Sequence, residues 1–361
     1  MAWRVRTADG VEIAVGVLGG PSGGGAEAER PVVVMAHATG FCGDVLGPVA
    51  AALTPEYECV GFDARGHGRS GLPPEHPGGW QRWDWHGFGL DVLAVVDWVA
   101  NRGAPGPGTA DRRGGPGPAS HEGGPGTASQ RGGPGTADRR GGPGTHGFGH
   151  SCGAAALLLA EIARPGTFAA IYTFEPVVFR PPPAGVLEVA SPLADMTRRR
   201  REVFESAAEA YANFASKGPF SAFDPAVLAA YVDCGFEHVA GGGVRLACRR
   251  EHEAFIYEAG LAHDAWDHLG EIACPVTVAY GQRSDFMGED DATALASRIP
   301  HGRVVEVGGV GHFGPMERPG EVATSVLAAF GSGVGAGFGA GVGAGVEPDA
   351  GSVRDLDTPL S

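Results

Sequence analysis

The chain has 361 residues, and 43% of them are hydrophobic, which is sufficient for a packed core. Its formal net charge of −15 argues against a nucleic acid or an anionic membrane surface as partner. No stretch is apolar over the length that a membrane-spanning helix needs, so we expect no insertion in a bilayer.

Strands and helices are predicted to alternate along most of the chain. Two strand-forming runs at 3–7 and 11–17 flank Ala8-Asp9-Gly10, which is typical of a β-hairpin. Further strands are predicted at 31–36, 57–62, 169–174, 275–280 and 303–307, and helices near 45–53, 84–100, 154–163, 290–299 and 320–330. This alternation indicates an α/β fold with a mostly parallel central sheet and helices on both faces.

Residues 103–144 interrupt this pattern with a low-complexity insert. A nine-residue unit recurs in it as GGPGPASHE, GGPGTASQR and GGPGTADRR. The unit lacks the apolar positions that a calcium-binding β-roll would bury, so we expect a disordered loop and no metal. The preceding helix runs back along the sheet, so the insert is predicted at the end of the sheet where the strands begin. The glycine-rich tail at 333–361 is also predicted to be disordered.

Residues 177–270 form a second interruption, and their pattern is helical. Apolar and aromatic residues between Val203 and Phe214 would share one face of a helix. Asp224 followed by Pro225 is typical of a helix start, and another helix is predicted at 253–260. The four arginines at 198–201 are interpreted as a solvated helix start. Inserted between two core strands at the carboxyl end of the sheet, the segment is predicted to act as a lid.

The pentapeptide Gly149-His150-Ser151-Cys152-Gly153 has the pattern G-x-S-x-G. Such a sequence suits a sharp strand-to-helix turn, because glycines on either side of the serine remove side chains that would clash. The turn exposes the serine oxygen and directs the next backbone N–H, that of Cys152, toward a substrate carbonyl oxygen. The strand that leads into it, Thr145–Gly149, is short and rich in glycine, so we expect a weak central strand.

A base and an acid follow in the chain order that such a turn requires. His312 lies on a glycine-rich loop after the strand at 303–307 and would take the proton from Ser151. Asp285 lies on the loop after the strand at 275–280 and would fix the imidazole tautomer. Glu175, directly after the strand at 169–174, is the rival acid, although Pro176 after it favours a chain exit there.

Two earlier loops add to this pattern. The strand at 31–36 opens into His37-Ala38-Thr39-Gly40-Phe41, where the Thr39 N–H can supply a second oxyanion donor. The strand at 57–62 leads into Asp63-Ala64-Arg65-Gly66-His67-Gly68-Arg69-Ser70.

Together these motifs resemble those of the α/β-hydrolase family, over residues 1 to about 330 apart from the insert. They are the H-x-x-G loop at 37–40, D-x-R-G-H-G-x-S at 63–70, G-H-S-x-G at 149–153, G-x-x-S-D at 281–285 and G-x-x-H at 309–312. The resemblance implies that Ser151, Asp285 and His312 form the catalytic triad, with the N–H groups of Thr39 and Cys152 as oxyanion donors. It also implies loop-shaping roles for His37, Arg65, Gly66, His67 and Gly68.

The six cysteines form no C-x-x-C pair and no Cys/His spacing typical of zinc. Unpaired cysteines without a signal peptide fit a reducing cytoplasm, which is the predicted location. The Cys152 thiol is interpreted as a small apolar filler.

The sequence therefore predicts an α/β-hydrolase domain over 1–332, which contains the insert and the lid, followed by the tail. The predicted function is a serine hydrolase that cleaves a carboxylic ester or related acyl bond through an acyl-enzyme, with a small-molecule substrate and no cofactor. Thioesters, amides or peptides, lactones and C–C bonds remain open as substrates. The alternative is a non-catalytic protein of the same fold that binds a small ligand, and the weak central strand motivates it.

Overall fold

An eight-stranded sheet forms the centre of the computed structural model, which describes residues 1, 3–19, 30–73, 84–102, 144–180, 191–260 and 262–331. The strand order is β1-β2-β4-β3-β5-β6-β10-β11. The strands are β1 (Trp3–Arg6), β2 (Glu12–Gly19), β3 (Val32–Ala36), β4 (Glu58–Phe62), β5 (Thr145–His150), β6 (Ala170–Phe174), β10 (Val276–Gly281) and β11 (Gly302–Val307). β1 and β2 pair antiparallel, as the hairpin prediction requires, and β2 also pairs antiparallel with β4. The six strands β4, β3, β5, β6, β10 and β11 are all parallel to their neighbours.

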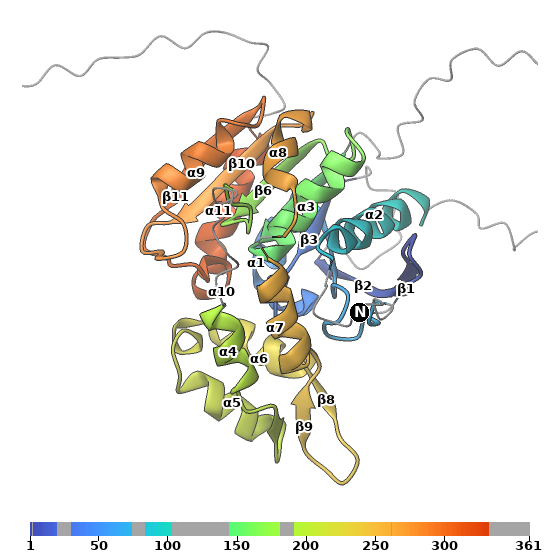
Figure 1. Ribbon diagram of the computed structural model, residues 1–361, viewed down its shortest axis with the longest axis vertical. Helices are drawn as coiled ribbons and strands as arrows, with labels where there is room; N and C mark the ends of the chain where they lie inside the picture. Colours follow the sequence, from blue (N-terminus) through green and yellow to red (C-terminus); the bar gives the residue numbers. More distant parts are fainter. Residues whose placement is uncertain are drawn as a thin grey trace, which may run out of the picture.

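Helices cover both faces of this sheet, as the alternating pattern predicted (Figure 1). Consecutive residues of β3 point to opposite faces. Val34 packs in the core shared with α2 (His86–Asn101) and α3 (Cys152–Ala163). Val33 and Met35 pack in the core shared with α1 (Gly47–Leu53) and α11 (Pro319–Gly331). The remaining core helices are η1 (Gly43–Leu46), α9 (Glu289–Ala296) and α10 (Gly314–Glu317).

The central strand β5 is fully formed, so the expectation of a weak strand is wrong. Its residues pair in parallel with β3 on one side and with β6 on the other. Gly147 is accommodated because the side chains of Leu157 and Phe168 fill the space beside it, 3.2–3.4 Å from where a Cβ would lie. Packing from α3 and the chain before β6 therefore compensates for the missing side chain.

The segment between β6 and β10, residues 191–271, is named here the helical segment. Residues 191–259 of it lie at one end of the sheet, next to α10, whereas residues 265–268 lie beside α3 at the other end (Figure 1). Its helices are α4 (Pro192–Arg198), α5 (Ala207–Ala215), η3 (Phe220–Ala222), α6 (Pro225–Cys234), α7 (Arg250–Ala259), α8 (Ala265–His268) and η4 (Leu269–Glu271). The Asp224 side chain accepts a hydrogen bond from the Ala226 N–H, which confirms the predicted helix start.

The helix predicted between Val203 and Phe214 begins later than expected. Val203 and Phe204 form the short strand β7 (Val203–Phe204) instead of extending a helix, because the Ser206 hydroxyl caps α5 through the Glu209 N–H. With β8 (Phe236–His238) and β9 (Val244–Leu246), β7 makes a three-stranded antiparallel sheet that the sequence analysis did not predict.

The arginine run at 198–201 is not a solvated helix start. Arg198 ends α4 and makes ion pairs with Glu251 and Glu258 of α7. Arg200 makes two hydrogen bonds to Glu253, whose side chain is only 3% exposed. Because a buried carboxylate requires a partner, these arginines join α4 to α7.

The sequence analysis assumed that all six cysteines are unpaired, but two of them form a disulfide. Cys42 and Cys234 form a disulfide with a Cα–Cα distance of 6.2 Å, across 192 residues of sequence. Cys59, Cys152, Cys248 and Cys274 are free and buried. The premise behind the predicted cytoplasmic location is therefore wrong for two of the six cysteines.

The low-complexity insert before Gly144 and the tail at 333–361 lie outside the described residues. Within the ranges that the structure describes, no helix is long and apolar enough to cross a membrane. The same ranges contain no group of three or more His, Cys, Asp or Glu side chains that could hold a metal ion.

Candidate active site

Ser151 occupies the sharp turn between β5 and α3. Its φ of 55° and ψ of −116° are values that a non-glycine residue rarely adopts. A Cβ on Gly149 would lie 2.6 Å from the Cα of Ala154, and one on Gly153 would lie 2.3 Å from the carbonyl oxygen of Ala36. Both glycines of the pentapeptide are therefore required by close backbone approach, which confirms the predicted turn.

The turn is fastened to the neighbouring strand. The Ser151 N–H donates to the Phe174 carbonyl at 2.9 Å, and the Val177 N–H donates to the Ser151 carbonyl at 3.3 Å. Cys152 begins α3, so its N–H is one of the first donors of a helix, which have no acceptor within it. These contacts hold the strained backbone at the carboxyl end of β5, beside the end of β6.

The loop at residues 37–43, which follows β3 and is named here the β3 loop, reaches the same place. The Thr39 side chain lies near the Cys152 thiol and favours its charged form. No residue that the structure describes accepts a hydrogen bond from the Thr39 N–H. Burial lowers the pKa of His67 to about 3, so its ring is neutral and Nε2 accepts the Gly40 N–H at 3.0 Å.

His312 lies on the loop after β11, where the motif predicted it. A Cβ on Gly281, at the end of β10, would lie 2.6 Å from the carbonyl oxygen of Gly311, so the two loops are in backbone contact. The His150 Nε2–H donates to the His312 carbonyl at 2.8 Å, and the two rings are 5.0 Å apart. His312 is therefore held against His150, the residue that directly precedes Ser151.

Glu175 is the carboxylate that contacts this histidine. Its Oε2 lies 2.6 Å from His312 Nδ1, and it is fully buried. The same carboxylate accepts the Gly281 N–H at 2.7 Å and the Ser284 hydroxyl at 2.8 Å. Since a carboxylate only accepts, Nδ1 carries the ring proton, and Nε2 of the neutral ring remains an acceptor.

Asp285 does not take this place, so its predicted contact with His312 is corrected in favour of the rival Glu175. The loop after β10 turns Ser284 toward Glu175 and places the Phe286 ring 4.3 Å from the His312 ring. Asp285 lies between these two inward-facing residues and is exposed to solvent. The alternation of side chains along this loop excludes it from the site.

Two side chains of the site were missed by the sequence analysis. Ser284 was assigned only to a motif, yet its hydroxyl binds the acid, and Phe286 covers the histidine ring. The signal for Glu175 was its position directly after a buried strand. The backbone of Glu175 has a φ of 47°, which is rare for a residue other than glycine. The residues around Glu175 in the sequence give no sign of this conformation.

One surface pocket of about 450 Å³ lies to the side of this cluster. Its walls include Phe179, Trp266, Met287 and Arg298, and Phe179 contacts Phe286 at 5.4 Å between ring centroids. None of Ser151, Glu175 and His312 lines it. Phe179 on the pocket wall contacts Phe286, which in turn contacts His312.

Comparison with known proteins gives consistent results. The chain resembles the crystal structures of an E-2-(acetamidomethylene)succinate hydrolase (TM-score 0.64, 16% identity, 92% of this chain and 99% of that chain) and an enol-lactonase from Burkholderia xenovorans LB400 (TM-score 0.59, 18% identity, 91% and 100%). It also resembles a thioesterase domain from the curacin biosynthetic pathway (TM-score 0.60, 17% identity, 90% and 99%). No match was found among curated protein sequences. The sequence model of a family described as "Alpha/beta hydrolase family" matches residues 33–325, so the chain belongs to the alpha/beta hydrolase family.

Proposed function

We propose that the protein is a serine hydrolase that cleaves a carboxylic ester or a related acyl bond. Ser151 is the nucleophile, His312 the general base and Glu175 the acid that orients His312. The observation that carries the proposal is the buried hydrogen bond of 2.6 Å between Glu175 and His312 beside the strained Ser151 turn. Family membership supports hydrolytic activity in general.

The proposed reaction has two steps. In the first, His312 Nε2 takes the hydroxyl proton as the Ser151 oxygen attacks the carbonyl carbon, and it then gives the proton to the leaving group. In the second, His312 takes a proton from water, which attacks the acyl-enzyme, and gives this proton to the Ser151 oxygen as the carboxylic acid leaves. Glu175 stabilises the imidazolium that forms in each step without taking the proton itself.

The N–H groups of Thr39 and Cys152 are the proposed oxyanion donors. Thr39 lies beside Cys152, and the Cys152 N–H has no acceptor within α3. Donors that are already oriented stabilise the negative charge of the transition state without reorganisation. Each such donor is worth roughly 10²–10³-fold in kcat in enzymes of this type.

The helical segment is proposed to be a lid over an apolar acyl or alcohol group. The rings of Phe220 and Phe223 in this segment lie 6.0 Å from that of Phe41 in the β3 loop. Phe223 also lies 5.5 Å from Phe313, the residue after His312. Aromatic side chains thus line the region between the two loops, which favours an apolar substrate group there.

The alternative, a protein that binds a ligand without catalysis, has less support. It was motivated by a weak strand before Ser151, and β5 is continuous and paired on both sides. A binding protein also has no need for a buried carboxylate on the histidine.

Covalent labelling tests the proposal. A fluorophosphonate probe is expected to label the wild-type protein at Ser151, and the Ser151→Ala variant is expected to remain unlabelled. Tryptic mass spectrometry identifies the modified residue, and circular dichroism establishes that both proteins are folded. A folded wild-type protein that stays unlabelled and does not hydrolyse a panel of short and medium acyl esters would contradict the proposal.

A further inference from the structure

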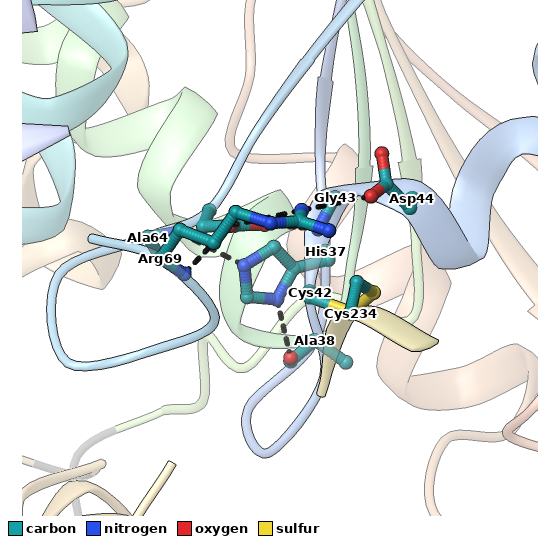
Figure 2. Close-up of a disulfide and its surroundings, with 9 residues drawn as sticks. His37, Ala38, Cys42, Gly43, Asp44, Ala64, Arg69 and Cys234 are labelled. Atoms are coloured by element: carbon teal, nitrogen blue, oxygen red, sulfur yellow. Dashed lines mark hydrogen bonds and ion pairs between the residues drawn. A yellow bond between two sulfur atoms is a disulfide. The ribbon is translucent and has the colours of Figure 1, made fainter. Parts of the chain in front are cut away.

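The β3 loop is anchored to the core on one side. The Gly40 N–H donates to His67 Nε2 at 3.0 Å, and the Gly43 N–H donates to Asp63 Oδ1 at 2.8 Å. Figure 2 shows the loop beside the disulfide, with His37 bonded both to Ala38 and to Ala64. These contacts all come from the loop itself or from the loop after β4, so they leave its opposite side to other partners.

That opposite side is bonded covalently to the helical segment. Cys42 lies in the β3 loop directly before Gly43, where the 3-10 helix η1 begins, and Cys234 is the last residue of α6 (Figure 2). Cys42 is fully buried and Cys234 is 2% exposed. The disulfide therefore joins the carboxyl end of α6 to a position three residues after Thr39.

The other end of α6 is attached to the loop that carries the histidine. The Asp224 N–H, at the N-cap of α6, donates to the Met316 carbonyl at 2.8 Å. Met316 lies in α10, which begins two residues after His312. A helix of 10 residues spans about 15 Å. This helix thus connects the loop of the proposed base to the loop of a proposed oxyanion donor.

We propose that the Cys42–Cys234 disulfide is a positioning cross-link for catalysis. It fixes the β3 loop against α6, so that the Thr39 N–H is held where the oxyanion forms. This inference rests on the proposed function. A misplaced oxyanion donor weakens only interactions that are made in the transition state. Loss of the disulfide is therefore expected to lower kcat more than it changes KM.

Packing limits the size of the effect. The Tyr231 ring, one turn before Cys234, lies 5.2 Å from the ring of Phe41, next to Cys42. This contact remains when the disulfide is broken, so α6 is loosened without being released. Loosening a donor without removing it is expected to lower kcat roughly tenfold, which is less than the 10²–10³-fold loss when a donor is deleted.

Reduction requires an external dithiol, such as dithiothreitol. Its thiolate attacks one sulfur to form a mixed disulfide, and the cysteine that leaves takes up a proton. The second thiol of the reagent then displaces the other cysteine, so that two electrons pass to the protein and the reagent becomes a cyclic disulfide. Since both cysteines are buried, this exchange needs α6 to move and is expected to be slow in the folded protein.

The test compares the full-length protein before and after reduction. In the oxidised protein, non-reducing peptide mapping is expected to find the Cys42–Cys234 cross-link. After complete reduction, kcat for an ester substrate is expected to fall roughly tenfold, with KM changed by less than about twofold. The Cys42→Ala/Cys234→Ala variant is expected to show the same low kcat, now insensitive to dithiothreitol.

Cys274→Ala is the matched control, because Cys274 is a buried free cysteine that precedes β10. It should behave as the wild-type protein does, both before and after reduction. An unchanged kcat in protein whose disulfide is shown to be cleaved overturns the inference, and so does failure of the two cysteines to pair under oxidising conditions. If the double variant does not fold, reduction of the wild-type protein decides alone.

The fluorophosphonate probe separates this inference from the proposed function. Slower labelling of Ser151 in the reduced protein supports the cross-link, and equal rates in both forms oppose it. Absence of labelling in both forms contradicts the proposed function itself.

Discussion

Glu175 and His312 are separated by 137 residues in the chain, yet Oε2 of the first lies 2.6 Å from Nδ1 of the second. The strand order explains the meeting. Glu175 directly follows β6, which pairs with β5 on one side and β10 on the other, and the loop after β11 folds back over the end of β10. The carboxylate is therefore next to both the Ser151 turn and the histidine loop.

This geometry predicts a strong asymmetry between two acidic residues. Glu175→Gln keeps the shape but removes the acceptor that fixes the His312 tautomer, so kcat is expected to fall about 10³–10⁴-fold. Asp285→Asn, at an exposed position, is expected to change kcat by less than about threefold. Ester turnover of both variants at pH 8 measures this, and the reverse ranking would return the role of acid to Asp285.

Ser284 is predicted to position the acid without touching substrate. Its hydroxyl donates to Glu175 at 2.8 Å, and a hydrogen bond to a charged group contributes about 1.5–3 kcal/mol. Ser284→Ala is expected to lower kcat about tenfold, near the smaller of these values. Ser284→Thr keeps the hydroxyl and should recover most of the activity; if it is as impaired as Ser284→Ala, the hydrogen bond is not the cause.

Cys152 is predicted to be chemically inert although it follows the nucleophile. Burial raises the pKa of its thiol to about 12, so at pH 8 only about one molecule in 10⁴ carries the reactive thiolate. Raising the pH toward this pKa increases the thiolate fraction tenfold per unit, so reactivity is expected to rise with pH. Iodoacetamide at pH 8 is therefore expected to leave ester turnover unchanged.

The Cys152→Ala variant serves as the control for that experiment. Its backbone N–H, the proposed oxyanion donor, is retained, so its turnover should stay close to that of the wild-type protein. Inactivation of the wild-type protein by iodoacetamide, with the variant resistant, would indicate a reactive thiol at this position.

Substitution of a glycine next to the Ser151 turn is predicted to cost more stability than substitution of a glycine elsewhere. A methyl group on Gly153 would lie 2.3 Å from the Ala36 carbonyl oxygen and 2.5 Å from that of His37. These are backbone atoms that cannot move aside, so Gly153→Ala is expected to lower the free energy of unfolding by about 1–3 kcal/mol. The variant is also expected to lose most labelling of Ser151.

Gly47→Ala is the matched substitution, because a Cβ at Gly47 meets nothing within 4 Å and the residue already has helical backbone angles. It is expected to be neutral or to stabilise α1 by about 0.4–1 kcal/mol. Urea denaturation measures both variants; similar losses from the two would show that close approach at Gly153 is not what requires the glycine.

The sequence by itself determined the strands of the central sheet, most of the helices that cover it, and the position of the turn. Alternating apolar strands and helices required a mostly parallel sheet, and G-x-S-x-G placed Ser151 between β5 and α3. These features depend on local backbone angles and on which side chains are apolar, and both are written in neighbouring residues. The helix start at Asp224 was predictable for the same reason.

Only the tertiary structure decided which distant groups meet. Asp285 and Glu175 both follow buried strands, and the choice between them depended on strand order and on the direction that the loop after β10 takes. The pairing of Cys42 with Cys234 likewise depended on where α6 crosses the β3 loop. Such contacts join residues more than a hundred positions apart, so the cause lies in how the elements pack and not in the pattern of any one segment.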